Sequence, residues 1–209
     1  APLFCRNFRL SLNGREFAFE LKINAPKARL SALIGPAAFL SDFLAQQVLE
    51  DLPGNPQVQC SRGCSECCRY LVAVSPAEAY SIRNAIAELD DKKRKQVVRK
   101  LLLSARQILH TRLPLINSGS GKQLSKKDEL AALSRWYAGL RLECPMLDND
   151  VCLIYKNRPF ACREHKALSN PTGCKAESTL DRKLLDTPIS MGEVLTQVSA
   201  AVENTEECV

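Results

Sequence analysis

The sequence predicts a predominantly helical α+β domain with an N-terminal β-hairpin packed on it, tied together by cysteine-ligated metal. Near the start, two alternating apolar runs flank an Asn-Gly pair, which is the pattern of a hairpin. Longer segments further on repeat apolar residues at helical spacing. Eight of the ten cysteines form two sets, Cys60, Cys64, Cys67 and Cys68, followed by Cys144, Cys152, Cys162 and Cys174.

Length and composition limit the class of protein. A chain of 209 residues can bury a core without disulfides. We find no signal-peptide pattern and no stretch approaching the roughly 18 apolar residues of a membrane span, so we expect a soluble cytoplasmic protein with no membrane partner. Because a reducing compartment would not preserve disulfides among so many cysteines, their spacing favours metal ligation.

The hairpin is predicted from alternation on both sides of a turn. Apolar residues alternate at Phe8, Leu10 and Leu12, then at Phe17, Phe19, Leu21 and Ile23. Asn13-Gly14 between them supplies the two positive φ angles of a type I′ turn. A lone hairpin is marginally stable, so its apolar face should pack on the helices. We therefore divide the chain into a hairpin extension, 1–35, and a helical cysteine-cluster domain, 36–209, with its core at 60–174. Cys5 precedes the hairpin and is expected to be a non-ligand.

Helices are predicted at 36–52, 76–89 and 90–112, then after Ser125 and Asp128, and again from Ser190 and Glu193. Ser75, Pro76 and Glu78 form the pattern of a capping box. The short run 70–74 resembles a strand. The segment 117–122 is predicted to be a flexible loop, and Cys208 to lie in a frayed tail.

Six lysines and arginines gather at the start of the segment 90–112. Such a run is usually a solvated helix face, and the other interpretation is a surface for an acidic protein partner or nucleic acid. The formal net charge of +6 counts every cysteine as neutral. Ligation of two divalent ions by eight thiolates would lower it to about +2, which weakens the case for nucleic acid.

The cysteine spacing itself leaves the metal open. Cys67 and Cys68 are adjacent, and neighbouring side chains diverge, so they are expected to serve two sites or two irons of one cluster. Eight thiolates divide into two groups of four, which suits tetrahedral zinc and [4Fe-4S] clusters alike. Between the two we favour iron-sulfur, because adjacent cysteines and a set split across the chain suit a polynuclear site at least as well as zinc.

The later motifs resemble a known family. Cys64-Ser65-Glu66-Cys67-Cys68, Cys144-Pro145-Met146-Leu147 and the run from Cys152 through Ile154-Tyr155 and Arg158-Pro159 to Cys162-Arg163 are similar to the YkgJ-type CxxCxxCC cysteine-cluster family. The resemblance covers about 60–174 and implies a domain that chelates zinc or iron. The family is also similar to the cysteine domain of flagellin lysine N-methylase, which implies a protein-modifying enzyme as one alternative. Cys60, Cys64 and Cys67 have the spacing of radical enzymes, but no α/β barrel pattern follows them.

Several other residues are candidates for supporting roles. Arg62, Arg69, Arg158, Arg163 and Lys166 flank the cysteines, where they either hydrogen-bond to sulfur or keep the surface soluble. Tyr155 is expected to shield the metal or to belong to the core. His165 has Cys-x2-His spacing after Cys162 and could replace Cys174 as a ligand. The sequence thus predicts a metal-binding protein. A structural-zinc module with a basic helix for an acidic or nucleic-acid partner is the other alternative.

Overall fold

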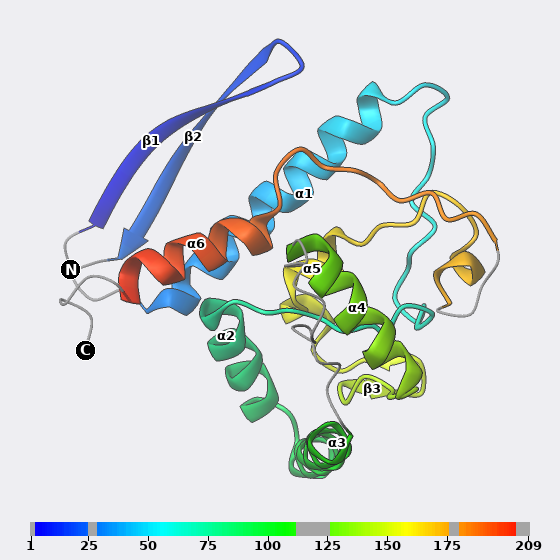
Figure 1. Ribbon diagram of the computed structural model, residues 1–209. Coiled ribbons are helices and arrows are strands. Elements are labelled where there is room, and N and C mark those ends of the chain that lie inside the picture. The colour runs from blue at the N-terminus through cyan, green and yellow to red at the C-terminus, as the bar shows by residue number, and fades with distance from the viewer. Residues whose placement is uncertain (1–2, 25–28, 112–125, 176–179, 204–209) are drawn as a thin grey trace, which may run out of the picture.

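In the computed structural model, which describes residues 3–24, 29–111, 126–175 and 180–203, the chain is mostly helical and carries two short antiparallel sheets (Figure 1). The α-helices of the described residues are α1 (Ile34–Asp51), α2 (Pro76–Ala87), α3 (Asp91–His110), α4 (Lys126–Gly139), α5 (Phe160–Glu164) and α6 (Met191–Glu203). Short 3-10 turns occupy Leu30–Leu33, Tyr155–Asn157 and Pro171–Cys174. The predicted class, α+β with mostly helices, is confirmed.

The N-terminal hairpin forms as predicted. Strands β1 (Leu3–Leu12) and β2 (Arg15–Asn24) pair antiparallel, with Leu12 opposite Arg15. Asn13 and Gly14 between them have φ of 50° and 76°, the left-handed angles that a two-residue turn requires. Alternation along this register puts Phe8, Leu10, Leu12, Phe17 and Phe19 on one face.

The apolar face of the hairpin packs on α1, as Figure 1 shows from the way the two strands lie along that helix. The ring of Phe43 meets the rings of Phe17 and Phe19 edge to face, with centroids 4.9 and 5.2 Å apart. At the turn, Arg15 donates to both carboxylate oxygens of Asp51 at 2.8 Å. The hairpin is therefore joined to α1 along its length, by aromatic contacts and by an ion pair.

The segment Leu30–Asp51, which contains α1, includes an 18-residue window with a mean hydropathy of 1.3, and it is long and apolar enough to cross a membrane by length and composition. The prediction that no stretch reaches that threshold was wrong, because it counted uninterrupted apolar residues rather than a window average. In this structure the helix packs on the hairpin, and its Asp42 forms ion pairs with Arg163 and Lys166 at 2.9 and 3.4 Å.

The predicted capping box at the start of α2 is confirmed, and its Glu78 also binds a residue outside the box that was not predicted. Ser75 accepts a hydrogen bond from the Glu78 N–H, and the Glu78 carboxylate accepts from the Ser75 N–H at 2.8 Å. The same buried carboxylate accepts from the Phe160 N–H at 2.7 Å. Glu78 thus caps α2 and also the N-terminus of α5, the helix that carries Cys162.

Replacing Glu78 by alanine should destabilise the fold by roughly 3 kcal/mol or more, because three buried donors on Ser75 and Phe160 would lose their acceptor. Urea unfolding measures this change. Glu88→Ala is the matched control, since Glu88 is exposed at the other end of α2. Equal stability of the two variants would show that the Glu78 carboxylate adds nothing beyond surface charge.

Two hydrophobic clusters hold the helices together. The first joins the hairpin, α1, α2, α5 and α6 around Leu44 and Phe160, each only 1% exposed. The second joins α2 and α3 to the loop of the second cysteine set around Val97. Because α2 contributes to both clusters, it connects the hairpin side of the molecule to the cysteine loops.

Other predicted elements have mixed outcomes. Asp90 caps α3 by accepting from the Lys93 N–H at 2.9 Å, and Ser190 caps α6 by accepting from the Glu193 N–H at 3.3 Å, both as expected. The run 70–74 is not a strand, because no strand of the described residues runs beside it to accept its backbone hydrogen bonds. Ser125, the loop 117–122 and Cys208 lie outside the described residues.

Candidate metal centre

The first cysteine set lies on a coil that turns back on itself twice. The Cys64 N–H donates to the Ser61 carbonyl at 3.1 Å, and the Cys68 N–H to the Ser65 carbonyl at 2.9 Å. Gly63, inside the first of these turns, has φ of 98°, an angle that side-chain-bearing residues rarely adopt. The glycine thus lets the coil present several thiols within a short stretch of chain.

The fold brings the second cysteine set against the first. The Cys144 N–H donates to the Cys68 carbonyl, and the Gln59 N–H to the Ala167 carbonyl, both at 2.8 Å. The Tyr70 hydroxyl donates to the Cys174 carbonyl. In Figure 1 the coil after α1 and the coils around β3 (Leu147–Asp148) and α5 lie on the same side of the molecule. Residues between 76 and 108 positions apart in sequence therefore share one region.

Electrostatic contacts between the thiols sort them into two groups of four. Cys60, Cys64 and Cys67 all act on Cys174, and Cys64 and Cys67 also act on Cys60. Cys144 and Cys162 act on Cys68, and Cys144 and Cys152 act on Cys162. The groups meet where the Cys68 thiol donates to the Cys67 sulfur, and where Cys67 also acts on Cys162. All eight predicted cysteines are thus brought together, and the adjacent pair is divided between the groups.

Backbone amides point at three of the sulfurs. The Ala167 N–H donates to the Cys60 sulfur at 3.2 Å. The N–H groups of Met146 and Ile154 hydrogen-bond to Cys144 and Cys152, each two residues earlier in the chain. Hydrogen bonds of this kind stabilise a thiolate, the form in which cysteine ligates metal.

The comparison with protein families agrees with this arrangement. A family model described as "CxxCxxCC: Putative zinc- or iron-chelating domain" matches residues 59–183, more than half of the chain. The chain belongs to this CxxCxxCC family. No curated protein and no solved structure matches it. Residues 59–183 contain both cysteine sets, and they leave out the hairpin, α1 and α6.

The thiols of the CxxCxxCC domain do not converge on one point where they could all bind a single ion. Among the residues that the structure describes, no group of three or more Cys, His, Asp or Glu side chains is arranged to hold a metal ion. All nine described cysteines are free thiols. The donor chemistry nevertheless suits zinc or iron, because eight thiols and three amides directed at sulfur lie in one region.

Burial sets the protonation of most of these thiols. It raises the pKa of Cys60, Cys144 and Cys152, and it raises that of Cys162 to about 12. The hydrogen bond from the Cys68 thiol lowers the pKa of Cys67 to about 7 and raises that of Cys68. Without metal the thiols with raised pKa would be neutral and Cys67 partly ionised, so metal binding must release protons.

Arg158 is the predicted basic residue that acts most widely on the thiols. Its guanidinium lies over the Tyr155 ring, 4.1 Å from the centroid, and its charge lowers the pKa of thiols in both groups. The stacked ring holds the arginine at the cysteines. Tyr155 therefore supports the centre through Arg158.

The other predicted basic residues have different partners. Arg163 donates to Asp42 at 2.9 Å and to the Lys156 carbonyl at 2.8 Å, and Lys166 also pairs with Asp42. Arg69 pairs with Glu143 at 3.5 Å. Arg163 and Lys166 thus anchor the second cysteine set to α1. Arg62 is exposed, as expected for a residue that keeps the surface soluble.

Arg182 was missed by sequence reasoning. It donates to the Tyr70 hydroxyl at 3.0 Å, and its charge lowers the pKa of Cys67 and Cys174. It lies beyond the last cysteine of the set and in no motif. The sequence offered only one signal for Arg182, namely a basic residue in the segment that follows the last cysteine of the second set.

His165 is still a candidate alternative ligand in the structure. Burial lowers its pKa, so the imidazole is neutral near pH 7. Its Nε2 is buried and has no hydrogen-bond partner within the described part of the chain. Its backbone carbonyl accepts from the Cys60 thiol at 3.8 Å, which places the residue beside the first group. Cys5, in contrast, lies exposed within β1 rather than before the hairpin as predicted, and it donates to Glu20.

Replacing Arg158 by glutamine should reduce the reactivity of Cys67 in the metal-free protein. A cation favours the thiolate and lowers the thiol pKa, so its removal shifts half-maximal alkylation to higher pH, by roughly half a unit. Iodoacetamide labelling across pH, read at each cysteine by mass spectrometry, measures the shift. Arg163→Gln is the control, because that guanidinium binds Asp42. An unchanged Cys67 profile in the Arg158 variant would contradict the role assigned to its charge.

Proposed function

We propose that this zinc- or iron-chelating domain holds two iron-sulfur clusters, one in each group of four thiols. The observation that carries the proposal is that eight thiols gather in two groups without converging on a point that could hold one ion. A zinc ion needs four donors directed at a single centre. In a [4Fe-4S] cluster each thiolate binds a different iron, so its ligands stand further apart.

Further support comes from the surroundings of the thiols. Amide hydrogen bonds to the sulfurs and nearby guanidinium charges are the groups that tune cluster potentials. Arg158 serves both groups, and Arg182 serves the group of Cys60. We also propose a cytoplasmic location, because free thiols in this number require a reducing compartment.

The test is the metal and acid-labile sulfide content of protein purified without oxygen and without added metal. We expect brown protein with about eight iron and about eight sulfide per chain. Colourless protein with about two zinc per chain would overturn the iron-sulfur proposal and make both centres mononuclear.

A further inference from the structure

One face of helix α3 packs against the rest of the protein. Val97 is fully buried in the second hydrophobic cluster. Along the same side, Lys100 donates to the Leu147 carbonyl at 2.6 Å, and Gln107 to the Leu140 carbonyl at 3.4 Å. These contacts hold the inner face of α3 on residues 140–148, the loop that includes Cys144.

The opposite face of α3 is open and carries an apolar row. Val98, Leu102, Ala105 and Leu109 follow one another at spacings of four, three and four residues. This is the spacing with which one helix packs against another in a coiled coil. Leu102 and Leu109 are 67% and 83% exposed. So much exposed leucine in one row is unusual for a solvated helix face.

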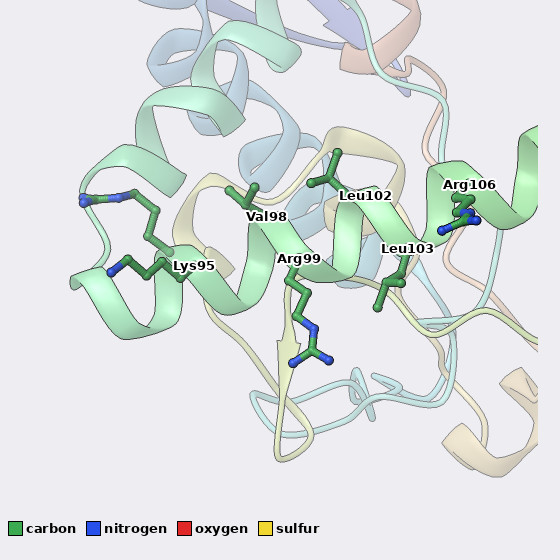
Figure 2. A pocket seen from close by; sticks show the side chains of 7 residues that line it. Lys95, Val98, Arg99, Leu102, Leu103 and Arg106 are labelled. Carbon is green, nitrogen blue, oxygen red and sulfur yellow. The ribbon is translucent and has the colours of Figure 1, made fainter.

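A basic row runs beside the apolar row. Lys95, Arg99 and Arg106 line the same shallow pocket as Val98 and Leu102. In Figure 2 Val98 and Leu102 project from one edge of the helix, and Arg99 and Leu103 from the other. The three cations form no ion pair or hydrogen bond with any residue that the structure describes. No acidic residue occurs in the sequence of α3 after Asp91, so the helix does not neutralise the row itself.

We propose that this outer face of α3, defined by the two rows, binds an amphipathic helix of another protein whose apolar row is flanked by acidic residues. Charge complementarity selects this occupant, since Arg99 and Arg106 stand where flanking charges decide pairing in coiled coils. Two copies of α3 would set basic rows against each other.

A membrane surface fits the face less well. A helix lying on a membrane buries a wide apolar face and keeps its cations on the other side. Here Arg99 and Leu103 project from the same edge of the helix, so the cation is not kept apart from the leucines, and Val97 on the far side is buried in protein.

The probe for this proposal is a synthetic 21-residue helical peptide with leucine at its two core heptad positions and glutamate at the flanking positions. Binding to the full chain would be measured by fluorescence anisotropy at near-physiological salt. We expect Arg99→Glu/Arg106→Glu, and separately Leu102→Gln, to weaken binding on the order of tenfold. Arg9→Glu/Arg83→Glu makes the same change of net charge on exposed residues elsewhere and should bind like wild type.

Three results would overturn the proposal. The first is no binding of the peptide by the wild-type chain, and the second is equal weakening in the Arg9/Arg83 control, which would indicate general charge attraction. The third is tighter binding to phosphatidylserine vesicles than to the peptide, lost in the same α3 variants, which would assign the face to a membrane. Metal content measured on each variant keeps this test separate from the proposed function, on which the inference does not rest.

Discussion

Replacing Cys68 by serine is expected to remove about half of the metal that the wild-type domain binds, and replacing Cys67 to remove the other half. The two residues are adjacent in sequence, but in the proposed division they belong to different groups of four thiols. A centre that loses one of four thiolates binds its metal far more weakly, whereas the other centre keeps its full set. The double variant Cys67→Ser/Cys68→Ser should therefore bind almost none.

The measurement is iron, zinc and sulfide per chain for each variant, prepared in the same way. Cys5→Ser is the matched control, because Cys5 is exposed on the hairpin and lies outside both groups. It should retain the wild-type content. If either single variant loses all of its metal while remaining folded, the eight thiols serve one shared centre and the division into groups is wrong.

Removal of the metal should loosen the two cysteine loops together. Between α1 and α2, and from β3 to the start of α6, the described chain has little regular structure, and few backbone hydrogen bonds join the two loops. Metal binding to such a region contributes directly to its folding. After treatment with ferricyanide and EDTA, amide exchange over residues 59–75 and 140–174 should therefore rise by roughly a hundredfold or more.

Amides of β1 and β2 provide the internal control in the same experiment. The hairpin is held to α1 by aromatic rings and by the Arg15–Asp51 pair, which contain no metal ligand. Its exchange should change little. Independent opening of the two cysteine loops would contradict the shared region, and simultaneous loss of hairpin protection would show that the metal supports the whole chain.

Local chemistry explains which elements could be predicted. Asn13-Gly14 determines its turn through its own φ angles, and Ser75 and Glu78 determine the start of α2 through hydrogen bonds within four residues. The run 70–74 failed because a strand is defined by its neighbour, which the sequence of that run does not contain. The bonds from Glu78 to Phe160 and from Arg163 to Asp42 were equally invisible, since each joins residues more than 80 positions apart.

The sequence by itself determined the hairpin, the positions of most helices and the eight cysteines as one family's motif, because these depend on spacing along the chain. Only the tertiary structure decided how the cysteines divide. In the proposed division Cys68 joins Cys144, while Cys67 joins Cys174, and the contacts behind it depend on which coils the two hydrophobic clusters bring together. Spacing places Cys67 and Cys68 side by side, and only packing sets which distant thiols each one faces.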